Sequence, residues 1–126
     1  MQQDITTNFG WWEFECHCGH CEMPEEVRRE VEHLVRTYLQ PLRDRLGKPI
    51  IIVSGYRCPS HNKAVGGARR SQHMYGRAAD IKVPGMSPPQ VHAAILDMWP
   101  DIGGLGLYRT WVHIDCRPNG PARWYG

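Results

Sequence analysis

The sequence predicts one domain that contains both helices and strands. Two segments carry apolar residues at helical spacing, and four short runs are β-branched or alternate between apolar and polar residues. The chain has 126 residues, of which 41% are hydrophobic and 22% charged, so it can build one core but not two catalytic units. We therefore expect a single domain over residues 1–126, with residues 1–22 as an N-terminal arm.

The arm begins with a polar stretch, residues 1–10, which we expect to fray. Large apolar side chains that must pack on the domain follow it: Trp11, Trp12 and Phe14. The first helix is expected from Pro24 to Leu46, because apolar residues recur there at helical spacing and Gly47 follows. Pro41 lies inside this pattern and lacks a backbone donor, so we expect a kink or a break at that point.

The middle of the chain is expected to hold two strands separated by a long loop. The β-branched run Ile50 to Val53 is typical of a buried strand. Residues 54–75 are polar and rich in glycine, and we expect them to form a structureless loop that carries function. Arg77 to Val83 alternate in polarity, which predicts the second strand.

The last third of the chain is expected to form a helix and a hairpin. Ser87 and Pro88 are typical of a helix start, and an apolar stripe continues to about Trp99. Residues 103–108 and 111–116 are predicted to pair as strands that turn at Arg109-Thr110.

Charge and hydropathy exclude several functions. The net charge is +2 and the basic residues are scattered, so a nucleic-acid partner is not expected. No basic stretch leads into an apolar one after Met1, so we expect no signal peptide and synthesis in the cytoplasm. The longest apolar run is too short to span a membrane, so we expect no membrane insertion. We also expect the protein to be a monomer.

Three residues have the chemistry of a catalytic zinc site. His73 and Asp80 lie seven residues apart, at the end of the glycine-rich loop and in the following strand, and His113 lies within a later strand. Two imidazoles and one carboxylate leave a tetrahedral zinc an open position for water. Taken alone, the same residues could equally be two hydrogen-bonded histidines and an ordinary strand carboxylate.

The residues around these ligands resemble a known family. The pattern Ser-x-His-x-x-Gly-x-Ala-x-Asp, formed here by residues 71–80, is similar to the signature of the zinc D-Ala-D-Ala carboxypeptidases. The resemblance runs from about Phe9 to Trp124. It includes three further segments: Ser54-Gly55-Tyr56-Arg57 with His61-Asn62, Gly66-Gly67, and residues 104–117. That family contains D,D-carboxypeptidases, D-Ala-D-Ala dipeptidases and phage L-alanyl-D-glutamate endopeptidases.

The resemblance implies an α+β fold of the hedgehog/DD-peptidase type, with helices packed on a small antiparallel sheet. It implies a zinc cofactor on His73, Asp80 and His113, and a peptidoglycan stem peptide as substrate. It also implies that Arg57 binds a substrate carboxylate or stabilises an oxyanion, unless it forms a structural ion pair. Ser71 either contacts substrate or caps the turn before His73. A phage or prophage endolysin, released to the cell wall by a separate pore-forming protein, is the biological role that fits.

One position departs from the family pattern. Thr110 stands three residues before the last histidine ligand, where well-known branches carry an acidic general base. Asp115 shares the strand face of His113, and it either replaces that base or orients a ligand. Glu13, Glu15 and Asp101 are more distant alternatives. A noncatalytic virion or cell-wall-binding module that keeps zinc for structure is the rival hypothesis.

Four of the five cysteines are candidates for a second site. Cys16, Cys18 and Cys21 have the spacing of metal ligands, and Cys58 lies next to Arg57. Together they could bind a structural zinc, with His17 and His20 as spare ligands, or Cys58 could form a disulfide with Cys16 or Cys18; free thiols are the third option. Cys116 is expected to be a small buried residue.

Overall fold

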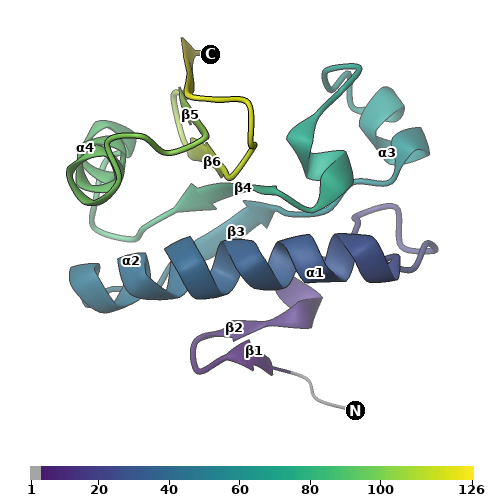
Figure 1. Cartoon of the computed structure of the whole chain (residues 1–126), viewed down its shortest axis with the longest axis horizontal. Coiled ribbons are helices and arrows are strands. Elements are labelled where there is room, and N and C mark those ends of the chain that lie inside the picture. Colours follow the sequence, from purple (N-terminus) through teal and green to yellow (C-terminus); the bar gives the residue numbers. More distant parts are fainter. Residues whose placement is uncertain (1–3) are drawn as a thin grey trace.

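A five-stranded sheet forms the centre of the computed structural model, which describes residues 4–126 (Figure 1). The strand order is β3-β4-β6-β5-β7. The bounds are β3 (Ile51–Ser54), β4 (Ala78–Lys82), β5 (Gly104–Leu107), β6 (Val112–Asp115) and β7 (Ala122–Tyr125). Neighbouring strands are antiparallel except β5 and β7, which are parallel. The expected α+β class is therefore confirmed, with one parallel pair added to the sheet.

The four strands expected from the sequence are present, but β3 lies at the sheet edge with Ile51 49% exposed, so its expected burial was wrong. β5 and β6 form the predicted hairpin, in which the backbone N–H of Tyr108 donates to the carbonyl of Trp111 at 3.0 Å. β7 was not expected. It is a four-residue edge strand that follows the Gly120-Pro121 bond, and its residues are alternately half-buried and exposed. Its sequence, Ala-Arg-Trp-Tyr, contains no β-branched residue and follows Pro121, so it carries too weak a strand pattern to be recognised.

One long helix runs across the sheet and does not break at Pro41 (Figure 1). It comprises α1 (Glu25–Leu34), a π-helical turn η2 (Val35–Leu39) and α2 (Gln40–Leu46). In the π turn the N–H of Gln40 bonds to the carbonyl of Val35, five residues back. This wider turn directly before Pro41 relieves the clash that the proline ring would make in a regular α-helix. Of the expected kink or break, the break was therefore wrong, and the helix is instead irregular directly before Pro41.

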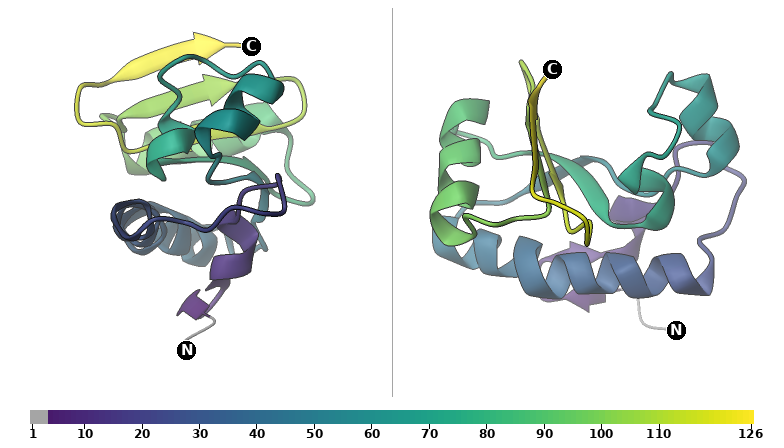
Figure 2. Two further views of the ribbon diagram at one scale, coloured as in Figure 1. Left: turned by 90° about the vertical axis from the view of Figure 1, so that its right-hand side faces the viewer. Right: turned by 45° about the horizontal axis from the view of Figure 1, so that its top comes forward.

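The core lies between this helix and the sheet. Apolar side chains on one side of the long helix are fully or almost fully buried: Val27, Val31, Leu34, Val35, Leu39 and Leu42. They pack with buried strand residues such as Ile81, Leu105 and Ile114. The predicted second helix is α4 (Pro88–Met98), and Ser87 caps it by accepting a hydrogen bond from the N–H of Gln90. Figure 2 shows α4 on one side of β5 and β6 and α3 on the other.

The N-terminal arm is folded rather than frayed over residues 4–10. β1 (Asp4–Thr6) and β2 (Phe9–Gly10) pair with each other, and η1 (Trp11–Phe14) follows. Ile5 and Phe9 are buried in the core, which explains why this segment is ordered. The expectation for residues 1–3 lies outside the described residues. Phe14 is buried as expected, whereas Trp12 is 71% exposed, so that part of the packing prediction was wrong.

The segment between β3 and β4 contains two short helices where a structureless loop was expected. They are α3 (Pro59–Ala64) and η3 (Gln72–Tyr75). Pro59 occupies the first turn of α3, and the Cys58 sulfur accepts a hydrogen bond from the N–H of His61. In η3 the Ser71 hydroxyl accepts from the N–H of His73 at 3.2 Å. Within the described residues, no helix is long and apolar enough to cross a membrane.

Candidate metal centre

His73 presents one ring nitrogen to the site and anchors the other to the backbone. It lies on η3 and is 2% exposed. Its Nδ1 is 2.7 Å from the carbonyl of Gly55, so Nδ1 carries the proton and donates. Its Nε2 is buried and has no hydrogen-bond partner in the described structure. An unpaired buried nitrogen lone pair of this kind is costly unless a ligand such as a metal ion takes it.

Asp80 and His113 meet this nitrogen because of the strand register. Asp80 on β4 lies directly opposite His113 on β6. The Oδ1 atom of Asp80 is 3.3 Å from His73 Nε2 and 3.1 Å from His113 Nδ1. All three residues are buried. The structure thus brings the three predicted metal ligands together.

The spacing of the three donor atoms fits a tetrahedral zinc. Zinc bonds of about 2.0–2.1 Å to nitrogen and oxygen place neighbouring ligand atoms roughly 3.3 Å apart. The two distances from Asp80 Oδ1 are 3.3 Å and 3.1 Å, and the three donor atoms all lie within 4.8 Å of one another. Two imidazoles and a carboxylate are also a donor set that zinc accepts. The residues present therefore fit the metal that the sequence predicted.

Asp115 lies behind His113 and holds its ring. His113 Nε2 donates to Asp115 Oδ2 at 2.7 Å, which leaves Nδ1 free to face Asp80. The Arg117 side chain donates two hydrogen bonds to the same carboxylate, from Nε to Oδ1 at 2.9 Å and from Nη2 to Oδ2 at 2.7 Å. Asp115 is fully buried. Gly104 on β5 lies directly opposite, and a β-carbon there would collide with the carboxylate.

Polar and charged neighbours together outweigh the effect of burial on the pKa of both carboxylates. Burial raises the pKa of Asp80, but the neighbouring imidazoles of His113 and His73 outweigh it and hold that pKa well below the ordinary range. Burial likewise raises the pKa of Asp115, and the hydrogen bonds from His113 and Arg117 lower it further than burial raises it. Burial lowers the pKa of His113, whereas its bonds to the two carboxylates raise it overall. Both acids are therefore carboxylates at neutral pH.

Arg57 points into the site from the segment after β3. Its Nη2 is 3.5 Å from Asp80 Oδ2, and its Nη1 donates to Asn62 Oδ1 at 3.2 Å. The side chain is 17% exposed, so it is held in place but still reaches solvent.

Ser71 caps η3 as one of its two predicted roles requires, and it also lines the open cleft beside the three predicted ligands.

Aromatic and basic side chains line this cleft, and sequence reasoning missed several of them. The Trp124 ring on β7 lies 4.9 Å from the His113 ring, and Trp124 Nε1 donates to the Tyr108 hydroxyl at 2.8 Å. Tyr108 in turn stacks on Trp111 with ring centres 4.8 Å apart. Arg70 and Arg117 add positive charge to the wall. Recognition of β7 would have been needed to place Trp124 here.

Asp80 is the only acidic side chain among the residues that line the cleft. Thr110 lies at the β5–β6 turn and lines a different hollow, beside Ile81 and Lys82. Glu13 bonds to the N–H of Gly10 in the arm, far along the chain from the ligands, and it does not line the cleft. Glu15 and Asp101 are exposed and also absent from the cleft wall. Asp115, behind His113, is thus the carboxylate most intimately connected to the three ligands.

The cysteines are placed at two locations. The sulfurs of Cys16, Cys18, Cys21 and Cys58 converge within 4.8 Å of one another. All five cysteines are free in the described structure. Cys116 lies apart from the four, half-buried, with its sulfur 3.6 Å from the carbonyl of Arg77.

Comparisons with known proteins show which family the sequence matches. The sequence pattern of the family described as peptidase M15 matches residues 7–115. The peptidoglycan L,D-endopeptidase MepK of Escherichia coli (strain K12) is 36% identical over 83 residues, which cover 60% of this chain and 43% of that protein. The zinc D-Ala-D-Ala carboxypeptidase of Streptomyces albus G is 50% identical over 44 residues, 34% of this chain and 17% of that protein. The match thus spans less than half the length of these curated relatives.

Proposed function

Because this chain belongs to the peptidase M15 family, we propose that it is a zinc peptidase that hydrolyses a peptide bond in peptidoglycan stem peptides. The observation that carries the proposal is the convergence of His73 Nε2, Asp80 Oδ1 and His113 Nδ1 at the spacing of zinc ligands. A zinc ion held by these three residues would supply Lewis-acid chemistry, which polarises a carbonyl and activates water. The remaining steps belong to side chains of the cleft.

Arg57 is proposed to bind the substrate. Its guanidinium is directed at Asp80 from the cleft wall, and part of it reaches solvent. A planar fork of N–H donors suits either a substrate carboxylate or the oxyanion that develops when the carbonyl is attacked. Ser71 is available on the same wall for a hydrogen bond to the substrate backbone. Arg57 would thus fix the scissile bond over the three ligands.

Asp115 is proposed to be a positioning residue. Its carboxylate accepts from His113 Nε2 and from two nitrogens of the Arg117 side chain, and it is fully buried. These contacts support a role in fixing the tautomer and the ring orientation of His113. Both oxygens of Asp115 are already occupied by these hydrogen bonds, so neither is placed to accept a proton from water in the cleft. We therefore prefer the positioning role to that of general base.

The cleft suits an anionic peptide. Arg57, Arg70 and Arg117 line it, against one acidic residue that is itself a proposed ligand. Tyr108, Trp111 and Trp124 supply flat apolar walls for an extended chain. Stem peptides carry free carboxylates beside small side chains, and the names of the two relatives refer to peptidoglycan and to D-Ala-D-Ala. The larger coverage of the endopeptidase leads us to expect cleavage within the stem.

Digestion of purified sacculi tests the proposal. We expect the zinc-loaded protein to create new amino termini in the stem peptides, which mass spectrometry of the released fragments detects and assigns to one bond. His73→Ala should create none, while His33→Ala, at an exposed histidine outside the cleft, should match the parent. If the folded, zinc-loaded parent yields no new termini, the rival hypothesis of a noncatalytic wall-binding module is correct. That outcome has one supporting observation, namely the scarcity of acidic groups in the cleft.

The endolysin role is a further proposal that rests on the resemblance alone. Expression of the chain in a bacterium with and without a separate pore-forming protein tests it. Lysis that requires both proteins would support it. Absence of lysis with both, for a protein that cuts sacculi in vitro, would reject it.

A further inference from the structure

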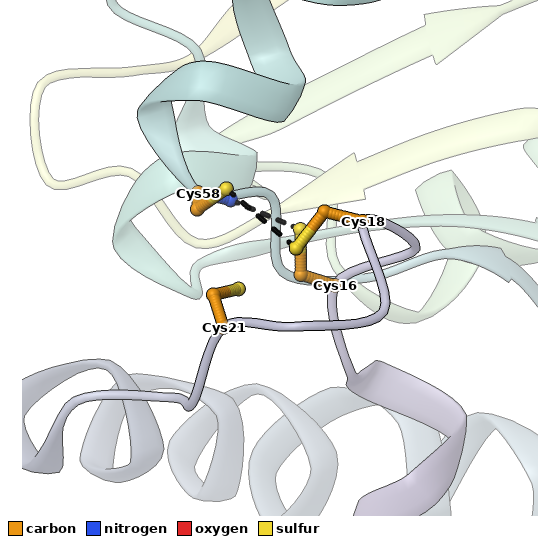
Figure 3. A group of neighbouring side chains, drawn as sticks. All are labelled: Cys16, Cys18, Cys21 and Cys58. Carbon is orange, nitrogen blue, oxygen red and sulfur yellow. Dashed lines mark hydrogen bonds between the residues drawn. The ribbon is translucent and has the colours of Figure 1, made fainter.

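Four cysteines from two segments that are distant in sequence meet where the N-terminal arm lies against the start of α3 (Figure 3). Cys16, Cys18 and Cys21 come from the irregular stretch between η1 and α1, and Cys58 precedes α3. Their sulfur atoms all lie within 4.8 Å of one another. The fold thus brings Cys58 next to three cysteines that end 37 residues earlier in the sequence, at position 21.

The spacing of the sulfurs matches a metal tetrahedron better than a disulfide. The sulfurs of Cys18 and Cys58 are 4.0 Å apart. A disulfide would bring two sulfurs to about 2.05 Å. Four thiolates around zinc, with bonds of about 2.3 Å, place neighbouring sulfurs roughly 3.8 Å apart. None of the four sulfurs is bonded to another, so all four are available as ligands.

Backbone N–H groups are directed at the sulfurs. The N–H of Cys58 donates to the Cys16 sulfur at 3.3 Å, and the N–H of His61 donates to the Cys58 sulfur at 3.5 Å. Such bonds stabilise the negative charge that thiolates carry when they bind a metal. Gly19 adopts a φ of 80° between Cys18 and Cys21, a left-handed conformation that turns the chain back on itself. Its N–H lies 3.4 Å from the carbonyl of Cys16.

We propose that Cys16, Cys18, Cys21 and Cys58 bind a second, structural zinc ion. Four protein ligands fill a tetrahedral zinc, so the site has no open position and no catalytic role. A soft set of four sulfurs selects zinc or iron over magnesium or calcium. His17 and His20, the spare ligands considered from the sequence, are both exposed and are not members of the converging group.

The position of the site explains what it would do. The arm and the segment Gly55 to Cys58 also touch through the N–H of Tyr56, which donates to the carbonyl of Phe14 at 2.9 Å. The carbonyl of Gly55 in that segment accepts a hydrogen bond from His73 Nδ1–H. Arg57 is the neighbour of Cys58. A zinc that fastens the arm to Cys58 would therefore hold in place both the Arg57 side chain and the backbone support of His73.

Metal analysis of the unmodified chain and of its variants tests the proposal independently of activity. We expect two zinc ions per chain in the parent, one in His73→Ala, and one in Cys18→Ser. Cys116→Ser is the matched control, because this fifth cysteine lies outside the group, and it should keep both ions. Loss of zinc from His73→Ala together with retention in Cys18→Ser would overturn the cysteine site without affecting the peptidase proposal.

Two measurements on the parent keep the test valid if a cysteine variant fails to fold. After cobalt replaces zinc, a thiolate-to-cobalt charge-transfer band is expected, which imidazole and carboxylate ligands do not produce. Alkylation in the native state should spare the four cysteines, and alkylation after denaturation with a chelator should modify all five. Absence of the charge-transfer band, or a disulfide that resists alkylation under denaturing conditions without a reductant, would contradict the proposal.

Discussion

At the scale of single residues, the two histidines of the proposed metal centre are each fixed through the nitrogen that does not face the site. His73 donates to the carbonyl of Gly55 and His113 donates to Asp115. The sequence motif predicted which residues would meet, because their types and spacing are characteristic. It could not predict which nitrogen each ring would present, because that depends on a carbonyl and a carboxylate placed by tertiary packing.

Asp115→Asn tests the positioning role. The amide keeps the shape of the carboxylate but loses its charge and part of its bonding to His113 and Arg117. Zinc affinity should therefore weaken by roughly 10–100-fold, and excess zinc should restore most of the turnover. Zinc titration with an activity readout measures both effects. Asp97→Asn, at an exposed carboxylate on α4, is the control. Lost turnover at unchanged zinc affinity would instead identify Asp115 as the general base.

Arg57→Lys tests the proposed substrate contact. Lysine keeps the positive charge but cannot reproduce two parallel hydrogen bonds, so kcat should fall by about 10²–10³ while zinc content stays constant. Steady-state kinetics on a defined muropeptide, with metal analysis in parallel, provide the measurement. Arg69→Lys, at an exposed arginine outside the cleft, should behave like the parent. Parent-like kinetics in Arg57→Lys would make this arginine structural.

At the scale of elements, segments with a clear apolar pattern were predictable and segments without one were not. The long helix, α4 and the strands β3 to β6 carry clear apolar patterns, and all of them are present. α3 has six residues, fewer than two helical turns, and β7 contains no β-branched residue, so neither carries a pattern clear enough to recognise. The helix continued past Pro41 because a π turn absorbs the proline, and no pattern of apolar residues indicates such a turn.

Gly104→Ala tests the strand pairing that builds the site. A β-carbon at position 104 on β5 would collide with the Asp115 carboxylate on β6, so either the strands separate or the carboxylate turns away from His113. We expect a loss of about 1–3 kcal/mol in the free energy of unfolding. Zinc binding should weaken as well. Chemical denaturation with and without zinc measures both, and a variant as stable as the parent would show that β5 is not packed against this carboxylate.

At the scale of the whole molecule, the sheet and the segments around α3 and η3 supply the two sides of the proposed metal centre. β4 and β6 provide Asp80 and His113, whereas η3 provides His73 and the segment before α3 provides Arg57. The arm contacts the segment before α3 through the carbonyl of Phe14, which accepts from the N–H of Tyr56. In our proposal the cysteine zinc adds a second link between the arm and that segment. The resemblance to a family indicated the α+β class in advance, but the parallel β7 and the ordered arm emerged only from the packing of Trp124 and Phe9.

The central claim is that three particular atoms hold the catalytic zinc. Anomalous diffraction at the zinc absorption edge from crystals of the metal-loaded protein tests it most directly. We predict a peak bonded to His73 Nε2, Asp80 Oδ1 and His113 Nδ1, distinct from any peak at the cysteines. A loaded crystal with no zinc among these three residues, or with zinc on the opposite nitrogen of either histidine, would contradict the account.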